Sequence, residues 1–319
     1  MSQEQLLGKD ILSVLPFHIS SLIKKCLDKE TRCLTEIRLR ANQPILLVFE
    51  AKDCFVAGHT CTCEDLSYTL QIMSKYSLYA YEQEIKMGFI TIQGGHRVGI
   101  SGQVILEDGN ILGIQNISSI NIRISREFLG CAEELYSYVL AENSYVYSTL
   151  IIAPPRCGKT TILRDLIRLL STGRGSFSGF QVGVVDERSE IAACQHGVPT
   201  VNLGPRVDVM DACPKGKGML MLIRSMSPTV IATDELGREE DAFAVREALT
   251  AGISVLATVH GKSAIELMER PYIGEIIKNG LFDRYVILSR NPQIGTLEKV
   301  VDTKTNTLIY EKKRIAYVL

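Results

Sequence analysis

The chain has 319 residues, of which 46% are hydrophobic and 22% are charged, so it is long and apolar enough for two domains of ordinary size. Its formal net charge of -1 gives no chain-wide electrostatic attraction to nucleic acid. The sequence has no apolar run of about 18 residues, and residues 1–10 are polar and acidic, so we expect neither a membrane span nor a signal peptide.

The nine cysteines are scattered along the chain. Cys61 and Cys63 are the only close pair, and the sequence offers no second pair and no histidine cluster that would complete a zinc site. We therefore expect reduced thiols, as in a cytosol.

Residues 1–143 are predicted to form an α+β domain, because helical and alternating apolar patterns both occur there. Thr62 and Asp65 have the spacing of a capping box. Two alternating segments flank Gly94 and Gly95, which predicts a hairpin, and the glycines that follow predict a bulge or a close backbone approach. In chain order the predicted elements are a helix over 11–27, strands over 36–40 and 45–49, helices over 62–75 and 77–85, a hairpin over 89–104, a strand over 118–125 and a helix over 131–142.

Residues 144–319 alternate apolar strands with amphipathic helices, which predicts a mostly parallel sheet covered by helices on both faces. The connections of such a sheet place the carboxyl ends of its strands along one edge. The predicted elements are strands over 147–152, 180–186, 229–234 and 253–260, helices over 158–170, 218–225 and 239–251, and a terminal hairpin of 296–301 and 307–310.

A strand, a tight loop ending in Gly-Lys-Thr and a helix form the setting of a phosphate-binding P-loop. Backbone N–H groups and the helix N-terminus favour phosphate there. We expect Lys159 to reach the β- and γ-phosphates of ATP, Thr160 to bind Mg²⁺, and Thr161 to donate to a phosphate. Ala153 stands where the motif usually has its first glycine, so this position must tolerate a Cβ atom. The predicted nucleotide-binding residues are Ala153, Pro154, Pro155, Arg156, Cys157, Gly158, Lys159, Thr160 and Thr161.

Acidic or imidazole side chains follow three later strands of the second domain. Asp234 is assigned to the metal shell and Glu235 to the attacking water, because phosphoryl transfer needs both functions beside a P-loop. Glu187 follows another strand and is a further catalytic candidate. His260 is assigned a role in sensing the γ-phosphate or in coupling it to conformation.

The order of these motifs resembles the secretion and type IV pilus motor ATPases. Residues 185–190 look like their Asp box, 228–238 like their Walker B segment and 249–260 like their His box, although Asp234 stands where those motors usually have glycine. Within that group the chain resembles the stage III sporulation AA family. The segments that carry this resemblance are 95–102, 154–161, 184–190 and 232–237, and it extends over about residues 36–288.

The resemblance implies a RecA-like ATPase that works as a homo-hexamer. It implies a cytoplasmic protein of the mother cell, peripheral at the membrane around the forespore, with membrane proteins of a secretion-like complex as partners. It also implies that arginines of the first domain, Arg97 and Arg123, complete the ATP site. Arg38 and Arg40 alternate on one strand and are either a solvated face or a ligand-facing pair.

Two other interpretations remain open at this stage. One is a nucleic-acid-dependent RecA-like ATPase, although the chain stops at Leu319 without room for a separate binding domain and its charge is nearly balanced, so no nucleic acid is expected. The other is a nucleotide-binding scaffold with little turnover, which the presence of both Asp234 and Glu235 argues against.

Overall fold

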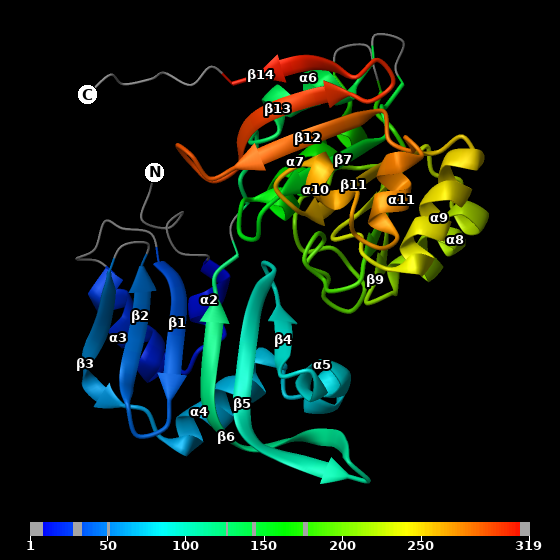
Figure 1. The fold of residues 1–319 in the computed structure, drawn as a ribbon. Coiled ribbons are helices and arrows are strands. Elements are labelled where there is room, and N and C mark those ends of the chain that lie inside the picture. Colours follow the sequence, from blue (N-terminus) through cyan, green and yellow to red (C-terminus); the bar gives the residue numbers. More distant parts are fainter. Residues whose placement is uncertain are drawn as a thin grey trace, which may run out of the picture. The chain divides into compact units, whose positions relative to one another are not determined.

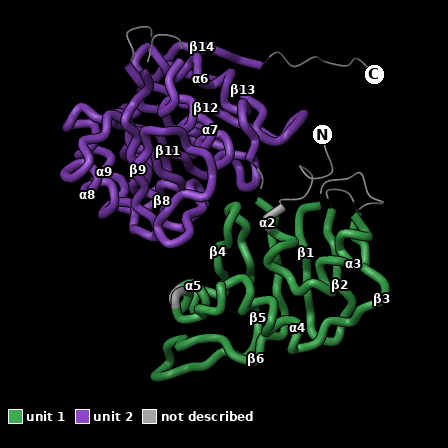
Figure 2. The backbone as a smooth tube through the Cα atoms, turned by 180° about the vertical axis from the view of Figure 1, so that it is seen from behind, with its two compact units in different colours: residues 1–126 green, residues 127–319 purple. Residues whose placement is uncertain are grey.

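The computed structural model describes residues 9–27, 34–49, 52–125, 127–141, 145–174 and 178–312. The chain divides into two compact units, residues 1–126 and 127–319 (Figure 2). Residues 1–8, and residues 143 and 144 at which the domain boundary is predicted, lie outside the described residues. Across the described ranges, no helix is both long and apolar enough to cross a membrane.

The first unit is built on a six-stranded antiparallel sheet in the order β3-β2-β1-β6-β5-β4 (Figure 1). Alternation along β1 and β2 buries Ile37, Leu39, Ile45 and Leu47 in a core that they share with the helices. The strands are β1 (Leu34–Arg40), β2 (Pro44–Phe49), β3 (Asp53–Thr60), β4 (Phe89–Ile92), β5 (His96–Glu107) and β6 (Asn110–Arg123). The helices are α2 (Lys9–Ser13), α3 (Phe17–Leu27), α4 (Cys63–Met73), η1 (Leu78–Tyr81) and α5 (Glu82–Lys86).

The structure confirms two local predictions in this unit and corrects a third. The capping box of α4 forms, because Asp65 N donates to Thr62 Oγ1 and Thr62 N donates to Asp65 Oδ2. At Gly102 an added Cβ would lie 2.6 Å from the carbonyl oxygen of Gln115, so the backbones approach closely there and the register shifts. The single helix predicted over 11–27 is instead α2 and α3, separated at Pro16, which cannot donate within a helix.

The second unit has an eight-stranded sheet in the order β14-β13-β12-β7-β11-β10-β8-β9, parallel from β12 to β9. Helices cover both faces, as predicted. Ile151 of β7 packs into the core that contains α6 and α7, while its neighbours Leu150 and Ile152 pack into the core that contains α8, α9 and α11. The strands are β7 (Thr149–Ala153), β8 (Val182–Asp186), β9 (Val207–Asp211), β10 (Val230–Thr233), β11 (Ser254–His260), β12 (Arg284–Ser289), β13 (Thr296–Asp302) and β14 (Thr307–Glu311). The helices are α6 (Glu133–Val139), α7 (Lys159–Thr172), α8 (Lys215–Ser225), α9 (Glu239–Thr250), α10 (Ala264–Leu267) and α11 (Ile273–Lys278).

Helix α6 belongs to the second unit. It buries Leu135 and Val139 in the same core as α7, and Ala132 N, just before α6, donates to the carboxylate of Asp165 on α7. The division between the units therefore falls before this helix, at 126/127, and not after it, at 143/144, where the sequence pattern places it.

Candidate active site

The P-loop connects the buried end of β7 to the first turn of α7. Gly158 caps α7 in the left-handed conformation, with φ of 79°, and a Cβ there would lie 3.1 Å from Cγ2 of Ile294, so glycine suits this position on both counts. Ala153 is completely buried at the end of β7, and its methyl group is part of the core. The missing first glycine of the motif is therefore accommodated by packing.

Lys159 is held inside the loop. Its ammonium group donates to the carbonyl oxygens of Ala153 (3.2 Å) and Pro154 (3.1 Å) and to Nδ1 of His260 (2.9 Å), so each of its three protons has an acceptor. The side chain is buried, and this burial lowers the pKa of Lys159, while Asp234 and Glu235 act in the opposite direction. These bonds hold the ammonium group against the carbonyl oxygens with which the loop begins.

Asp234, which follows β10, connects the first turn of α7 to β11. Its Oδ2 accepts a hydrogen bond of 2.6 Å from Thr160 Oγ1, and its Oδ1 accepts bonds from Thr258 Oγ1 and from the backbone N–H of Glu235. Thr258 belongs to β11, which lies between β7 and β10. The hydroxyl and the carboxylate assigned to the metal are thus direct neighbours.

Glu235 and His260 form the other contact across the same strand ends. Nε2 of His260 lies 2.5 Å from Oε1 of Glu235, and Oε2 of Glu235 lies 3.4 Å from Nη1 of Arg188. Because Nδ1 of His260 accepts from Lys159, Nε2 carries the proton that Glu235 accepts. Glu235 has a positive φ of 50°, an uncommon backbone state for a residue other than glycine and one that recurs at functional sites.

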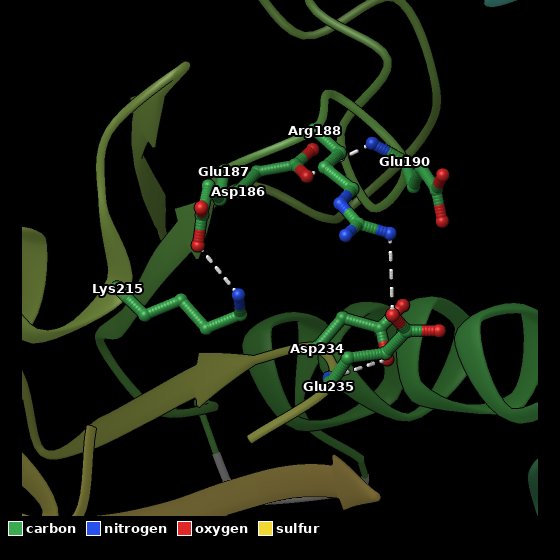
Figure 3. A pocket seen from close by; sticks show the side chains of 7 residues that line it. All are labelled: Asp186, Glu187, Arg188, Glu190, Lys215, Asp234 and Glu235. Carbon is green, nitrogen blue, oxygen red and sulfur yellow. Dashed lines mark hydrogen bonds and ion pairs between the residues drawn. The ribbon is translucent and has the colours of Figure 1, made fainter. Parts of the chain in front are cut away.

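Glu187 lies in a pocket beside these groups (Figure 3). Its carboxylate accepts from Lys215 Nζ at 2.5 Å and lies 3.5 Å from Nη1 of Arg238. Burial alone would raise the pKa of Glu187, but the bond to Lys215 and the charges of Lys215, Arg238 and Arg188 outweigh burial and lower it. The pocket is lined by Asp186, Glu187, Arg188, Glu190, Lys215, Asp234 and Glu235.

Asp186 builds the loop that carries these residues. Its carboxylate accepts from the backbone N–H groups of Glu190, Ile191 and Ala192 at 2.8 to 2.9 Å. Burial raises its pKa to about 6, while those N–H groups act in the opposite direction. Arg164 of α7 donates to the carbonyl oxygens of Glu190 and Ile191, so the loop is also tied to the helix that starts with Lys159.

The structure brings Lys159, Thr160, Asp234, Glu235 and His260 together at the carboxyl ends of β7, β11 and β10, as the predicted topology requires. Sequence reasoning missed Thr258, Arg188 and Lys215. Thr258 has a detectable signal, since it lies two residues before His260 and so shares its strand face. Lys215 has no such sequence signal, because it begins α8 within a segment whose sequence predicts irregular structure.

Arg97 and Arg123 are placed within the first unit, directly opposite one another on β5 and β6. The guanidinium of Arg97 lies 3.8 Å from the ring centroid of Phe89, and Nε of Arg123 lies 3.8 Å from a carboxylate oxygen of Glu36. Arg38 pairs with the same Glu36 at 2.6 Å, which accounts for one of the two alternating arginines as an ion pair within the sheet.

The fold is that of known motor ATPases. The Legionella pneumophila ATPase DotB superposes with a TM-score of 0.55 at 15% identity, covering 86% of this chain and 76% of DotB. The pilus retraction motor PilT, determined with bound ADP, gives a TM-score of 0.56 at 12% identity over 84% of this chain and 76% of PilT.

Sequence comparison identifies nearer relatives. Stage III sporulation protein AA of Bacillus subtilis (strain 168) is 45% identical over 299 residues, which cover 94% of this chain and 96% of that protein. The model of the family Sporulation stage III, protein AA matches residues 6–308. The chain therefore belongs to the sporulation stage III, protein AA family.

Proposed function

We propose that this chain is an ATPase that hydrolyses ATP to ADP and phosphate at the P-loop of its second unit. The observation that carries the proposal is the meeting of four groups at one sheet edge. Lys159 and Thr160 begin α7, and Asp234 and Glu235 follow β10. Phosphoryl transfer needs these functions together: a cation for the phosphates, two oxygen ligands for a metal ion, and a carboxylate for water.

The donor set fits Mg²⁺. A threonine hydroxyl and a carboxylate oxygen 2.6 Å apart are hard oxygen ligands of the kind that Mg²⁺ prefers, and Thr258 holds the second carboxylate oxygen in place. When bound, the ion neutralises charge that develops on the phosphate oxygens. Thr160 Oγ1 and Asp234 Oδ2 are the groups that would hold it.

Each side chain of the site has a role that follows from its contacts. Lys159 exchanges its carbonyl acceptors for the β- and γ-phosphates, because a phosphate oxygen is the stronger partner for an ammonium group. Glu235 accepts a proton from the attacking water or orients it. His260 contacts both Lys159 and Glu235, so a movement of Lys159 toward the phosphates also shifts Glu235. Glu187, fixed by Lys215, adds negative charge beside the water.

We further propose that the enzyme is a motor that energises a secretion-like complex during sporulation. The name of its Bacillus subtilis relative supports a sporulation role, and the fold of DotB and PilT supports a motor. On this proposal the chain forms a homo-hexamer in the mother cell, at the inner face of the membrane that surrounds the forespore. Its partners are membrane proteins of that complex, and Arg97 and Arg123 complete the ATP site in the ring.

The direct test is phosphate release from ATP by the wild-type chain and by Lys159→Ala. The variant should lose turnover, because no other buried ammonium group reaches the described P-loop residues. Lys217→Ala, a change at an exposed lysine of α8, serves as the matched control and should keep activity. Full activity in Lys159→Ala would contradict the assignment of the P-loop.

A further inference from the structure

The first unit contains a cluster that the proposed reaction does not use: His18 of α3, His59 of β3 and Asp65 of α4. Nε2 of His18 lies 2.8 Å from Asp65 Oδ1, and Nε2 of His59 lies 2.8 Å from Asp65 Oδ2. The two rings meet edge to face with centroids 5.1 Å apart. All three ligand atoms lie within 4.8 Å of one another, and within the described ranges no other group of three His, Cys, Asp or Glu side chains does so.

Separate elements of the fold bring the three side chains together. Helix α3 packs against β3, and α4 follows β3 after a short connection (Figure 1). The carboxylate of Asp65 is fixed independently of the histidines, because the backbone N–H of Thr62 donates to its Oδ2 at 2.9 Å in the capping box. This hydrogen bond orients the carboxylate before any ion binds. Outer-shell hydrogen bonds orient metal ligands in the same way in other proteins.

The chemistry of the donors selects the class of ion. Imidazole nitrogen suits Zn²⁺ and other late first-row metals, whereas Mg²⁺ and Ca²⁺ prefer oxygen ligands only. Ligand bonds of about 2.0 to 2.2 Å in a tetrahedral site put the ligand atoms about 3.3 to 3.5 Å apart. Two of the present spacings are 2.8 Å, shorter than that range, and all three lie within 4.8 Å, so modest side-chain rotations would bring the ligand atoms into it.

The cluster is also accessible to solvent. The side chain of His18 is 50% exposed, which leaves a position for water as a fourth ligand.

We propose that His18, His59 and Asp65 form a binding site for one divalent transition-metal ion of the zinc class, which ties α3 and β3 to the start of α4. The site is separate from the P-loop and does not depend on ATP hydrolysis. Sequence patterns do not predict this site, because His18 and Asp65 are 47 positions apart and the three residues do not have the ligand spacing of a zinc motif.

The test is to titrate the metal-free full-length chain with Zn²⁺ alone and to measure binding by calorimetry. Thermal unfolding with and without Zn²⁺ is measured in parallel. We expect one Zn²⁺ per chain at this site and a rise in Tm. His18→Ala and His59→Ala should each weaken this binding at least about 10-fold, because each removes a ligand and losing an outer-shell partner alone costs that much. Each should also remove the rise in Tm. Asp65 is left unchanged, since its loss would also remove the cap of α4.

Cys63→Ser is the matched control, because this exposed thiol begins α4 two residues before Asp65. It should bind Zn²⁺ as the wild type does, and far-ultraviolet circular dichroism of the metal-free variants should show that they remain folded. The proposal fails if the wild type takes up no Zn²⁺. It fails equally if both histidine variants, still folded, bind as the wild type does, or if binding is lost in Cys63→Ser and kept in His18→Ala.

Discussion

Thr160 Oγ1 donates a 2.6 Å hydrogen bond to Oδ2 of Asp234, although the two residues are 74 positions apart. The bond joins the first turn of α7 to the end of β10 across the intervening strand β11. It places the two oxygen ligands proposed for Mg²⁺ next to each other before any nucleotide binds.

Removing the Thr160 hydroxyl should therefore weaken the response to Mg²⁺. In Thr160→Ala we expect half-maximal ATP turnover to need at least about tenfold more Mg²⁺, because one of two protein ligands is gone. Thr160→Ser keeps the hydroxyl and should behave as the wild type. An unchanged Mg²⁺ titration in Thr160→Ala would contradict the assignment of the metal ligands.

Glu235→Gln should separate binding from chemistry. The introduced amide keeps an oxygen that can accept from His260 Nε2 but cannot take a proton from water, so ATP should stay bound while turnover falls about 10²- to 10⁴-fold. Binding of a fluorescent ATP analogue and phosphate release measure the two steps. Glu239→Gln, at an exposed carboxylate that begins α9, is the control. Loss of binding in Glu235→Gln would mean that Glu235 holds the nucleotide and does not activate water.

The raised pKa of Asp186 predicts a pH-dependent contribution to stability. A carboxyl group with a pKa of about 6 in the folded state and about 3.9 in the unfolded chain binds its proton more tightly when folded. Its contribution to the free energy of unfolding is thus largest below pH 4 and falls by roughly 3 kcal/mol as the pH rises to about 6 and above.

Urea unfolding of the wild type and of Asp186→Asn between pH 4 and 8 measures this contribution. The advantage of the wild type should shrink as pH rises through this window, since asparagine does not titrate. A difference between the two proteins that is constant with pH would show that the three backbone N–H groups hold Asp186 ionised throughout.

If Arg97 completes the site of a neighbouring subunit, inactive chains should complement one another. Arg97→Ala and Lys159→Ala should each have little turnover alone. Mixed in equal amounts, they should regain a part of it, because some interfaces join an intact arginine to an intact P-loop. Arg38→Ala, on strand β1 of the same sheet, replaces Arg97→Ala in the control. An equal mixture with no more turnover than its components would place Arg97 in its own chain's site or in none.

The parts of the fold set by local pattern were predictable from the sequence. Residues 147–152 and 158–170 read as strand and helix around a Gly-Lys-Thr loop, and the structure has β7 and α7 there. The close approach at Gly102 was readable from its place among glycines. Strand β9 (Val207–Asp211) was missed, because it is short, half-buried and set in a stretch rich in glycine and proline.

Side-chain pairing in the site was predictable only where topology alone decides it. Parallel strands bring Asp234 and His260 to the edge of the P-loop wherever their side chains point. The bond from Lys215 to Glu187 depends on where α8 starts, and that from Arg188 to Glu235 on the turn that Asp186 shapes. Such contacts are tertiary, and no residue spacing encodes them.

The most direct test of the central claim is Mg·ATP turnover per chain measured against protein concentration, with Glu235→Gln as the blank. The proposed ring motor predicts turnover above the blank that rises steeply with concentration, because each site is completed between subunits. Turnover that stays at the level of the blank at every concentration would contradict the ATPase. Turnover that is measurable but flat would contradict the ring and leave each chain as a self-sufficient enzyme.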